Sequence, residues 1–221
     1  IVHGGDRLGL YYYEESAALR SSSIVYDRED SSITTIKSGM IDWKKTFSEA
    51  RLFHWSGITS AVSQGAAEVT NEAVEEAARE GITISCDINY RANLWKYGKD
   101  AHDVLLPIAQ KSDIVFGTAD EWKLITGITP PDFKATTPDY PIDSAAYKEY
   151  FGKASKILPK AKKMIVALRN TLSANHHLLS GVIFADGKLY TTRIYDIDDV
   201  LDPMGVGDAF IAAYLHAHLK Y

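Results

Sequence analysis

Nine residues near the end of the chain, 202–210, combine a glycine turn with two carboxylates in the order Asp-Pro-Met-Gly-Val-Gly-Asp-Ala-Phe. They lead into an apolar-periodic stretch that ends near Leu219, so the pattern predicts that the turn opens a helix. Such a turn leaves unpaired backbone N–H groups at the positive end of the helix dipole, which suits a phosphate or an oxyanion. Asp208 follows the second glycine directly, and proton abstraction is the chemistry that a carboxylate could perform there.

The same residues have a purely structural interpretation. A loop that ends in an N-capping Asp208 would also satisfy the spacing. A Gly-x-Gly turn by itself does not separate this interpretation from an anion site.

The longer string resembles the signature of the ribokinase-like (PfkB) sugar kinases, Asp-Thr/Pro-x-Gly-Ala/Val-Gly-Asp-x-Phe. The resemblance implies that Gly205, Val206 and Gly207 form an anion hole for the transferred phosphoryl group. It implies that Asp208 is the base for the sugar hydroxyl and that Asp202 lies beside the nucleotide phosphates. ATP and Mg²⁺ are the cofactors that this family implies.

A second polar cluster follows the apolar run 82–87, where Asp87, Asn89 and Arg91 alternate with a period of two. This spacing predicts that they share one face just past a buried strand, although a turn with a solvated arginine is the structural alternative. Asp-x-Asn-x-Arg-x-x-Leu-Trp resembles the segment of 2-keto-3-deoxygluconate kinases, a branch of this family. The resemblance implies that Arg91 holds the substrate carboxylate in a bidentate fork and that Asn89 contacts the substrate.

The amino-terminal segments 9–14 and 23–28 are aromatic and β-branched, which predicts two strands of a small flap, with 31–36 as a possible third strand. By the same resemblance Tyr11, Tyr26 and Arg28 contact the substrate, and Ile58 adds a backbone contact at the end of the next strand. Packing of the tyrosines on an edge strand is the alternative. The register among three consecutive tyrosines is open by one residue.

Two further segments depart from the family pattern. Glu121 matches the residue that orders Mg²⁺ through water, but Thr118 replaces the usual asparagine, and a capping box explains the same pair. Arg169 follows the predicted strand 164–168, where many relatives have a Gly-x-Lys-Gly-like nucleotide loop. The resemblance assigns Arg169 to the nucleotide. We interpret His176 and His177 as surface residues rather than a metal site.

From Arg51 onward, predicted strands and helices alternate, which favours a doubly wound, mostly parallel α/β sheet with ligands at the carboxyl ends of its strands. With the family resemblance, we expect residues 1–40 to form part of the flap and its connections, and residues 41–221 to form the nucleotide- and sugar-binding core. The predicted helices span 63–80, 100–109, 119–126 and 144–156, and the predicted strands span 52–55, 82–87, 113–116, 164–168, 181–185 and 189–194.

Composition limits the partners. The 221 residues carry a formal net charge of −5, so neither nucleic acid nor an anionic membrane is expected as a partner. One cysteine, Cys86, excludes an internal disulfide and fits a reducing, cytoplasmic compartment. The chain begins at Ile1 and ends at Tyr221, and since members of the family are longer at both ends we expect it to be incomplete.

The sequence therefore predicts an ATP-dependent kinase for the terminal hydroxyl of a sugar acid, converting 2-keto-3-deoxygluconate to 2-keto-3-deoxy-6-phosphogluconate. A kinase for a neutral sugar such as fructose or ribose is the nearest alternative. A non-catalytic sugar-acid-binding or oligomerisation module is the alternative from another class. We also expect a homo-oligomer formed through the β flap.

Overall fold

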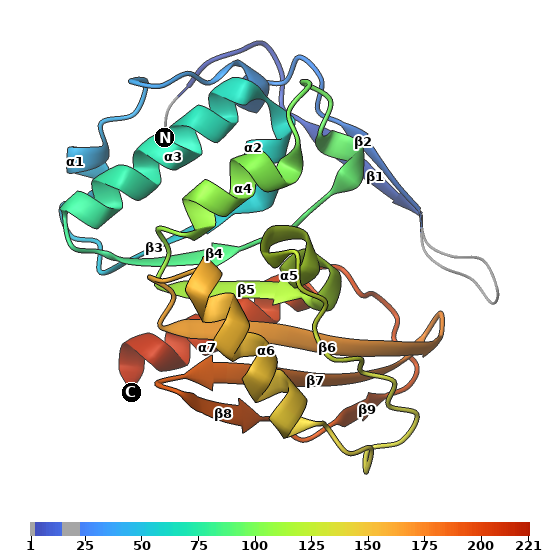
Figure 1. Ribbon diagram of the computed structural model, residues 1–221. Helices are drawn as coiled ribbons and strands as arrows, with labels where there is room; N and C mark the ends of the chain where they lie inside the picture. The colour runs from blue at the N-terminus through green and yellow to red at the C-terminus, as the bar shows by residue number, and fades with distance from the viewer. Residues whose placement is uncertain (1–2, 15–22) are drawn as a thin grey trace.

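The computed structural model describes residues 3–14 and 23–221, and a seven-stranded sheet forms its centre. The strands lie in the order β3-β4-β5-β6-β7-β8, and β9 pairs with β7 (Figure 1). The first four are parallel, and the rest pair antiparallel. Their bounds are β3 (Leu52–Ser56), β4 (Thr83–Asp87), β5 (Ile114–Thr118), β6 (Lys163–Ser173), β7 (His176–Ala185), β8 (Lys188–Thr191) and β9 (Tyr195–Ile197). The predicted α/β class is confirmed.

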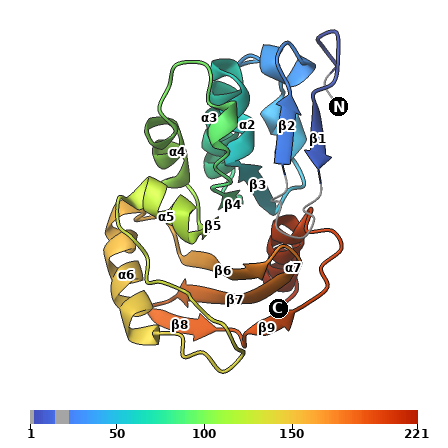
Figure 2. The ribbon, with the colours of Figure 1, turned by 90° about the vertical axis from the view of Figure 1, so that its right-hand side faces the viewer.

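Helices cover both faces of this sheet (Figure 2). One face carries α2 (Gly57–Val62), α3 (Gln64–Arg79), α4 (Ala101–Ala109), α5 (Ala119–Thr126) and α6 (Ser144–Ile157), with the short α1 (Trp43–Phe47) beside them. The other face carries α7 (Val206–Lys220). Two 3-10 turns, η1 (Ser32–Thr35) and η2 (Ala92–Leu94), lie in the connections.

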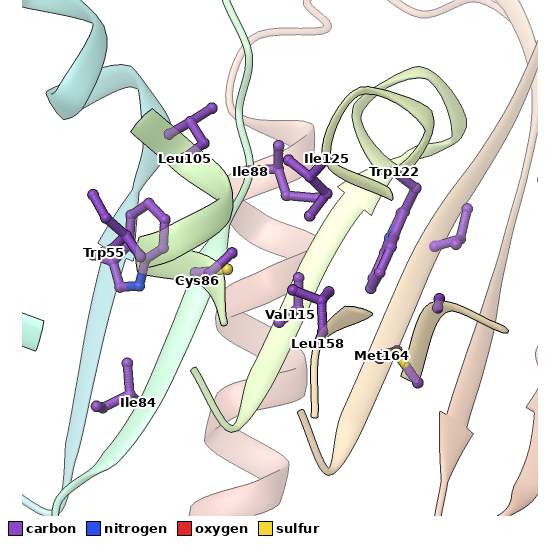
Figure 3. Close-up of a cluster of buried hydrophobic side chains, with 14 of the residues drawn as sticks. Trp55, Ile84, Cys86, Ile88, Leu105, Val115, Trp122, Ile125, Leu158 and Met164 are labelled. Carbon is purple, nitrogen blue, oxygen red and sulfur yellow. The ribbon is translucent and has the colours of Figure 1, made fainter. Parts of the chain in front are cut away.

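Strands β5 and β6 alternate their side chains between two of the hydrophobic clusters, as the pleat of a β-sheet requires. The larger cluster lies under the helices α2 to α6 and includes Ile84, Val115 and Trp122 (Figure 3). The smaller one packs Phe116 and Ile165 against α7. Burial on both faces fixes the ends of the parallel strands, and these strand ends carry the polar residues of interest.

The amino-terminal flap is a separate two-stranded antiparallel sheet of β1 (Leu10–Glu14) and β2 (Ser23–Asp27). The predicted third strand at 31–36 is wrong, because that segment contains the 3-10 helix η1. The hydroxyls of Ser31 and Thr34 donate to backbone carbonyls three residues earlier, and such local bonds compete with strand pairing. The hydroxyl of Ser32 donates to the carbonyl of Arg7. Residues 1–2 and 15–22 of the predicted flap lie outside the described residues, and the boundary near residue 40 stays a prediction.

Strand β6 is longer than predicted. The sequence places its end at Leu168, but pairing with β7 continues to Ser173. Arg169 therefore lies on the strand, and the predicted strand end at Leu168 is wrong. The partner strand β7, which begins at His176, supplies the hydrogen bonds that hold this polar segment extended.

Candidate active site

Four ionisable side chains interact electrostatically near the carboxyl ends of the parallel strands. They are Asp87, Arg91, Glu121 and Asp208. Asp87 ends β4, and its burial, reinforced by the carboxylate of Glu121, raises its pKa to about 7. The Arg91 guanidinium acts in the opposite direction, and the Asp208 carboxylate raises the pKa of Asp87 further. The structure thus places the segment after β4 beside the start of α7, although the two are far apart in sequence.

The first turn of α7 has the geometry of an anion site. Gly205 precedes the helix with a φ of 76°, and the first bond onto its carbonyl comes from Ala209 N–H at 2.8 Å. The N–H groups of Val206, Gly207 and Asp208 accordingly form no hydrogen bond with another described residue. A Cβ added to Gly205 or to Gly207 would have no neighbouring atom within 4 Å, so this turn faces open space.

Asp208 lies in the first turn of the helix, and its side chain is exposed. The alternative in which Asp208 is the N-cap is wrong, because Gly205 occupies that position. Burial lowers the pKa of His54 on β3. The nearby Asp208 charge acts in the opposite direction, but more weakly.

Asn89 and Arg91 lie beyond the end of β4. The predicted period of two does not continue there, because Asn89 has a left-handed φ of 39° and turns the chain out of the strand. Its side-chain amide donates to Ser56 Oγ at 2.9 Å, while Asn89 Oδ1 is buried without a partner among the described residues. Arg91 Nη1 donates to the carbonyl of Tyr90 at 3.0 Å and lies 3.6 Å from Glu121 Oε1, leaving most of an exposed guanidinium available.

Glu121 is held by a capping box, as one of the two interpretations predicts. Its Oε2 accepts from the N–H of Thr118 at 2.8 Å and from its hydroxyl at 3.0 Å. Its Oε1 accepts from Tyr90 N–H at 2.9 Å, which ties the start of α5 to the segment after β4. The role of Glu121 toward Mg²⁺ stays a prediction.

Asp202 and Arg169 occupy different surroundings. Asp202 Oδ1 accepts from Met204 N–H at 2.8 Å and so shapes the turn before Gly205. Arg169 lines a pocket of 290 Å³ between α5, the proline-rich loop after it and β6. The pocket residues are Thr118, Ala119, Asp120, Lys123, Thr129, Pro130, Pro131, Asp132, Phe133, Ala167, Leu168 and Arg169. The nucleotide roles of Asp202 and Arg169 stay predictions.

The flap brings its predicted substrate residues onto one face. Tyr11 lies directly opposite Tyr26 in the β1–β2 register, so their side chains share a face, whereas Tyr12 points to the other. Arg28 extends over the Tyr26 ring, with Cζ 5.5 Å from the ring centre, and its Nε is buried without a hydrogen-bond partner among the described residues. Ile58 lies in the first turn of α2, directly after β3.

Sequence reasoning missed two residues near this region. Lys123 lines the pocket with Arg169, and His177 is buried rather than on the surface, so the interpretation of His177 as a surface residue is wrong. Its neighbour His176 faces outward and binds Asp196 at 2.6 Å. Successive side chains along β7 point to opposite faces of the sheet, which separates the two imidazole rings. The sequence predicts that this strand begins only at Gly181, so it does not indicate this separation.

Comparison with known proteins decides the family. The sequence profile of pfkB family carbohydrate kinases matches residues 1–220. The chain belongs to the pfkB family of carbohydrate kinases. The pfkB signature at 202–210 is therefore the segment that forms the open turn before α7.

Several relatives of this pfkB-family chain carry names of sugar-acid kinases. The crystal structure of 2-dehydro-3-deoxygluconokinase from Thermotoga maritima has 30% identity and a TM-score of 0.85, covering 98% of this chain and 63% of that one. The 2-dehydro-3-deoxygalactonokinase of Haloferax volcanii is 26% identical over 95% of this chain and 57% of its own length. A PfkB family carbohydrate kinase from Listeria grayi has 32% identity and a TM-score of 0.80, covering 98% of this chain and 62% of its own. The chain thus spans about three fifths of the length of these relatives.

None of the helices in the described part of this pfkB-family chain is both long and apolar enough to cross a membrane.

Proposed function

We propose that this pfkB-family chain provides the catalytic turn and the acid-binding side of an ATP-dependent sugar-acid kinase. The substrate of the proposal is 2-keto-3-deoxygluconate, phosphorylated at its terminal hydroxyl. The observation that carries the proposal is the open glycine turn at the start of α7, with unpaired N–H groups and Asp208 in the same turn.

The proposed chemistry follows from that turn. Asp208 accepts the proton of the terminal hydroxyl while the hydroxyl oxygen forms a bond to the γ-phosphorus, and the bond from this phosphorus to the bridging oxygen breaks to release ADP. The N–H groups of Val206, Gly207 and Asp208 stabilise the charge on the transferred phosphoryl group. Holding the hydroxyl next to Asp208 supplies most of the remaining acceleration.

The choice of a sugar acid rests on Arg91. Its guanidinium is exposed, and its described contacts are one backbone carbonyl and a carboxylate oxygen of Glu121 at 3.6 Å. The guanidinium can therefore donate two parallel hydrogen bonds to a substrate carboxylate. Arg28, Tyr11, Tyr26 and Asn89 complete the proposed substrate side. The names of the Thermotoga and Haloferax relatives support this class of substrate.

The charge balance of the site fits a divalent cation. Burial and the carboxylates of Glu121 and Asp208 raise the pKa of Asp87, while Arg91 is the cation among the described residues that acts against them there. Mg²⁺ prefers oxygen ligands and would relieve this repulsion, with Glu121 holding it through water. When bound, it would supply charge neutralisation for the nucleotide phosphates. Asp202 and Arg169 are the proposed nucleotide contacts.

We further propose that two copies of the chain pair through the outer face of the flap. Leu10, Tyr12 and Val25 lie on the face opposite to Tyr11 and Tyr26, and all three are exposed. A hydrophobic strand face of this kind is typical of an interface.

A substrate screen tests the function. The full-length protein should consume ATP with 2-keto-3-deoxygluconate at a kcat/KM at least about a hundredfold above that with fructose or ribose, because an Arg91 without a carboxylate is left unpaired. Preference for fructose would instead support the neutral-sugar alternative. A relative with a name of that class is a probable chloroplastic fructokinase of Arabidopsis thaliana, which is 24% identical over 76% of this chain. Binding of the sugar acid without any ATP turnover would identify a non-catalytic module.

A further inference from the structure

Arg7 joins the two arms of the flap at its base. Its Nη1 donates to Asp27 Oδ2 at 3.2 Å and to the carbonyl of Leu8 at 3.3 Å. Its Nη2 donates to Asp27 Oδ1 at 2.5 Å and to the carbonyl of Glu29 at 2.6 Å. Leu8 lies on the chain that enters β1, whereas Asp27 ends β2 and Glu29 follows it. One guanidinium therefore holds both arms through both of its terminal nitrogens.

The contact between Arg7 and Asp27 serves geometry more than stability. The two side chains are 36% and 44% exposed, and an ion pair at such a position adds little to the free energy of unfolding. The flap is also a two-stranded sheet separate from the central one, so the core does not depend on it. A planar fork of donors does, however, fix the direction of the groups that it binds.

The acceptors of this guanidinium lie on both sides of Arg28. Asp27 precedes Arg28 and Glu29 follows it, so the chain is held before and after this residue. The carbonyl of Arg28 itself accepts from Ser31 N–H at 3.2 Å and from Ser31 Oγ at 2.6 Å. The backbone that carries Arg28 is thus fixed at three consecutive residues, and its side chain extends over the Tyr26 ring.

The charge of Arg28 remains available for a ligand. Arg28 forms no ion pair with an acidic side chain within residues 3–14 and 23–221. The adjacent carboxylate of Asp27 is engaged by Arg7 instead. A guanidinium on a fixed backbone loses less conformational freedom when it binds an anion.

We infer that Arg7 is a positioning residue, which fixes the backbone around Arg28 and so presents the Arg28 guanidinium to the sugar acid. The inference rests on the proposed function, which places Arg28 on the substrate side. Arg7 itself does not touch the substrate, so its effect should pass through Arg28.

Calorimetric titration of the full-length protein with 2-keto-3-deoxygluconate, without ATP, tests the inference independently of turnover. Arg7→Lys keeps the charge but cannot hold both arms, so the affinity should fall roughly three- to tenfold. Arg28→Met should weaken binding at least as much. Adding Arg7→Lys to Arg28→Met should change the affinity by less than about twofold, because the two residues would act as one unit.

The double variant separates positioning from general support of the flap. If Arg7 supported the whole flap, its loss would also displace Tyr11 and Tyr26, and the two losses would add. In a kinase assay Arg7→Lys should raise the KM for the sugar acid, while kcat and the KM for ATP stay within about twofold.

Two further variants complete the test. Arg79→Lys makes the same exchange at a surface ion pair with Glu76 on α3, and it should leave the affinity for the sugar acid unchanged. Asp27→Asn keeps an oxygen acceptor for Arg7 but removes the charge, so it should cause a smaller loss in the same direction.

The outcomes separate this inference from the proposed function. If wild type does not bind the sugar acid, both fail. If it binds without turnover, the kinase function fails alone and the affinities still decide the role of Arg7. If a folded Arg7→Lys binds as tightly as wild type, or if the losses add in the double variant, the inference fails and the proposed function stands. Thermal unfolding establishes which variants are folded, and Asp27→Asn replaces Arg7→Lys if that variant is unfolded.

Discussion

Asp87 shows how the surroundings of one residue set its charge. It ends a parallel strand that is buried on both faces, and its pKa is raised to about 7, first by burial and then by the carboxylate of Glu121. In the unfolded chain an aspartate has a pKa near 3.9, so between these values the native state binds the additional proton. The stabilisation from this proton is therefore present at low pH and is lost as the pH rises through about 7.

This linkage predicts a pH dependence of stability in the absence of Mg²⁺. Between pH 6 and pH 8 the wild type should lose about 1.4 kcal/mol of unfolding free energy from Asp87 alone. Asp87→Asn cannot ionise, so it should lack this component of the change. Urea unfolding at both pH values in the presence of a chelator measures the difference. Equal losses for the two proteins would show that Asp87 is already ionised at pH 6.

Arg91 offers a second test at this scale. Arg91→Lys keeps the charge but removes the planar fork, so KM for the sugar acid should rise roughly tenfold or more with a smaller change in kcat. Steady-state kinetics on 2-keto-3-deoxygluconate measure both constants. Arg79→Lys, at a surface ion pair with Glu76 on α3, is the matched control and should leave KM unchanged. A KM unaltered by Arg91→Lys would remove Arg91 from the carboxylate site.

The residues of the site that the sequence predicts are those with local signatures. Gly205 and Gly207 are recognisable because a turn that opens a helix needs them in that order, and Glu121 because its partner Thr118 is three residues away. His177 has no such signature. Its contact with Arg169 of the adjacent strand exists only once β6 and β7 are paired.

At the scale of elements, the approach of β3 to the segment after β4 depends on one glycine. A Cβ on Gly57 would lie 2.0 Å from the carbonyl oxygen of Ile88, so backbone has to move to accept a larger residue. This contact joins the start of α2, with Ile58, to the chain that carries Asn89 and Arg91. The positions of Ile58, Asn89 and Arg91, the proposed substrate contacts, are therefore coupled.

Gly57→Ala should destabilise the protein by roughly 2–3 kcal/mol and also raise KM for the sugar acid, because the strain falls on the backbone of the site. Gly152→Ala is the matched control, since Gly152 lies within helix α6 and a Cβ added to it would have no atom within 4 Å. That control should be stabilised by about 0.5–1 kcal/mol. Thermal unfolding together with steady-state kinetics measures both effects, and a neutral Gly57→Ala would contradict the close approach.

Elements with their own start and stop signals were predictable, and those without them were not. Helix α5 has the predicted bounds 119–126, because Thr118 caps its start and Gly127 ends it with a left-handed φ of 68°. The second half of β6 is polar and lacks any apolar alternation, so only its pairing with β7 defines it. Helix α2 was included in no predicted helix, since its six residues are too few to show a period.

At the scale of the whole molecule, the flap projects from the side of the sheet at which the parallel strands end, the side on which α7 begins (Figures 1 and 2). Its inner face carries Tyr11 and Tyr26, and its outer face carries exposed Tyr12 and Val25. If two copies pair through the outer face, charges placed there should separate them without altering the inner face.

Tyr12→Lys combined with Val25→Lys should accordingly shift the full-length protein from dimer to monomer in sedimentation velocity at micromolar concentration. Met40→Lys, at a similarly exposed position in the loop before α1, is the control and should leave the dimer intact. A wild type that is monomeric at all concentrations would contradict the proposed interface.

The most direct test of the central claim, that the turn before α7 is the site of phosphoryl transfer, is the kcat of Asp208→Asn with ATP and 2-keto-3-deoxygluconate. We expect kcat to fall by at least roughly a thousandfold, since the amide cannot accept the proton of the hydroxyl. ADP affinity should stay within about threefold, because the N–H groups of the turn are unchanged. Turnover close to that of the wild type would show that Asp208 is not the base.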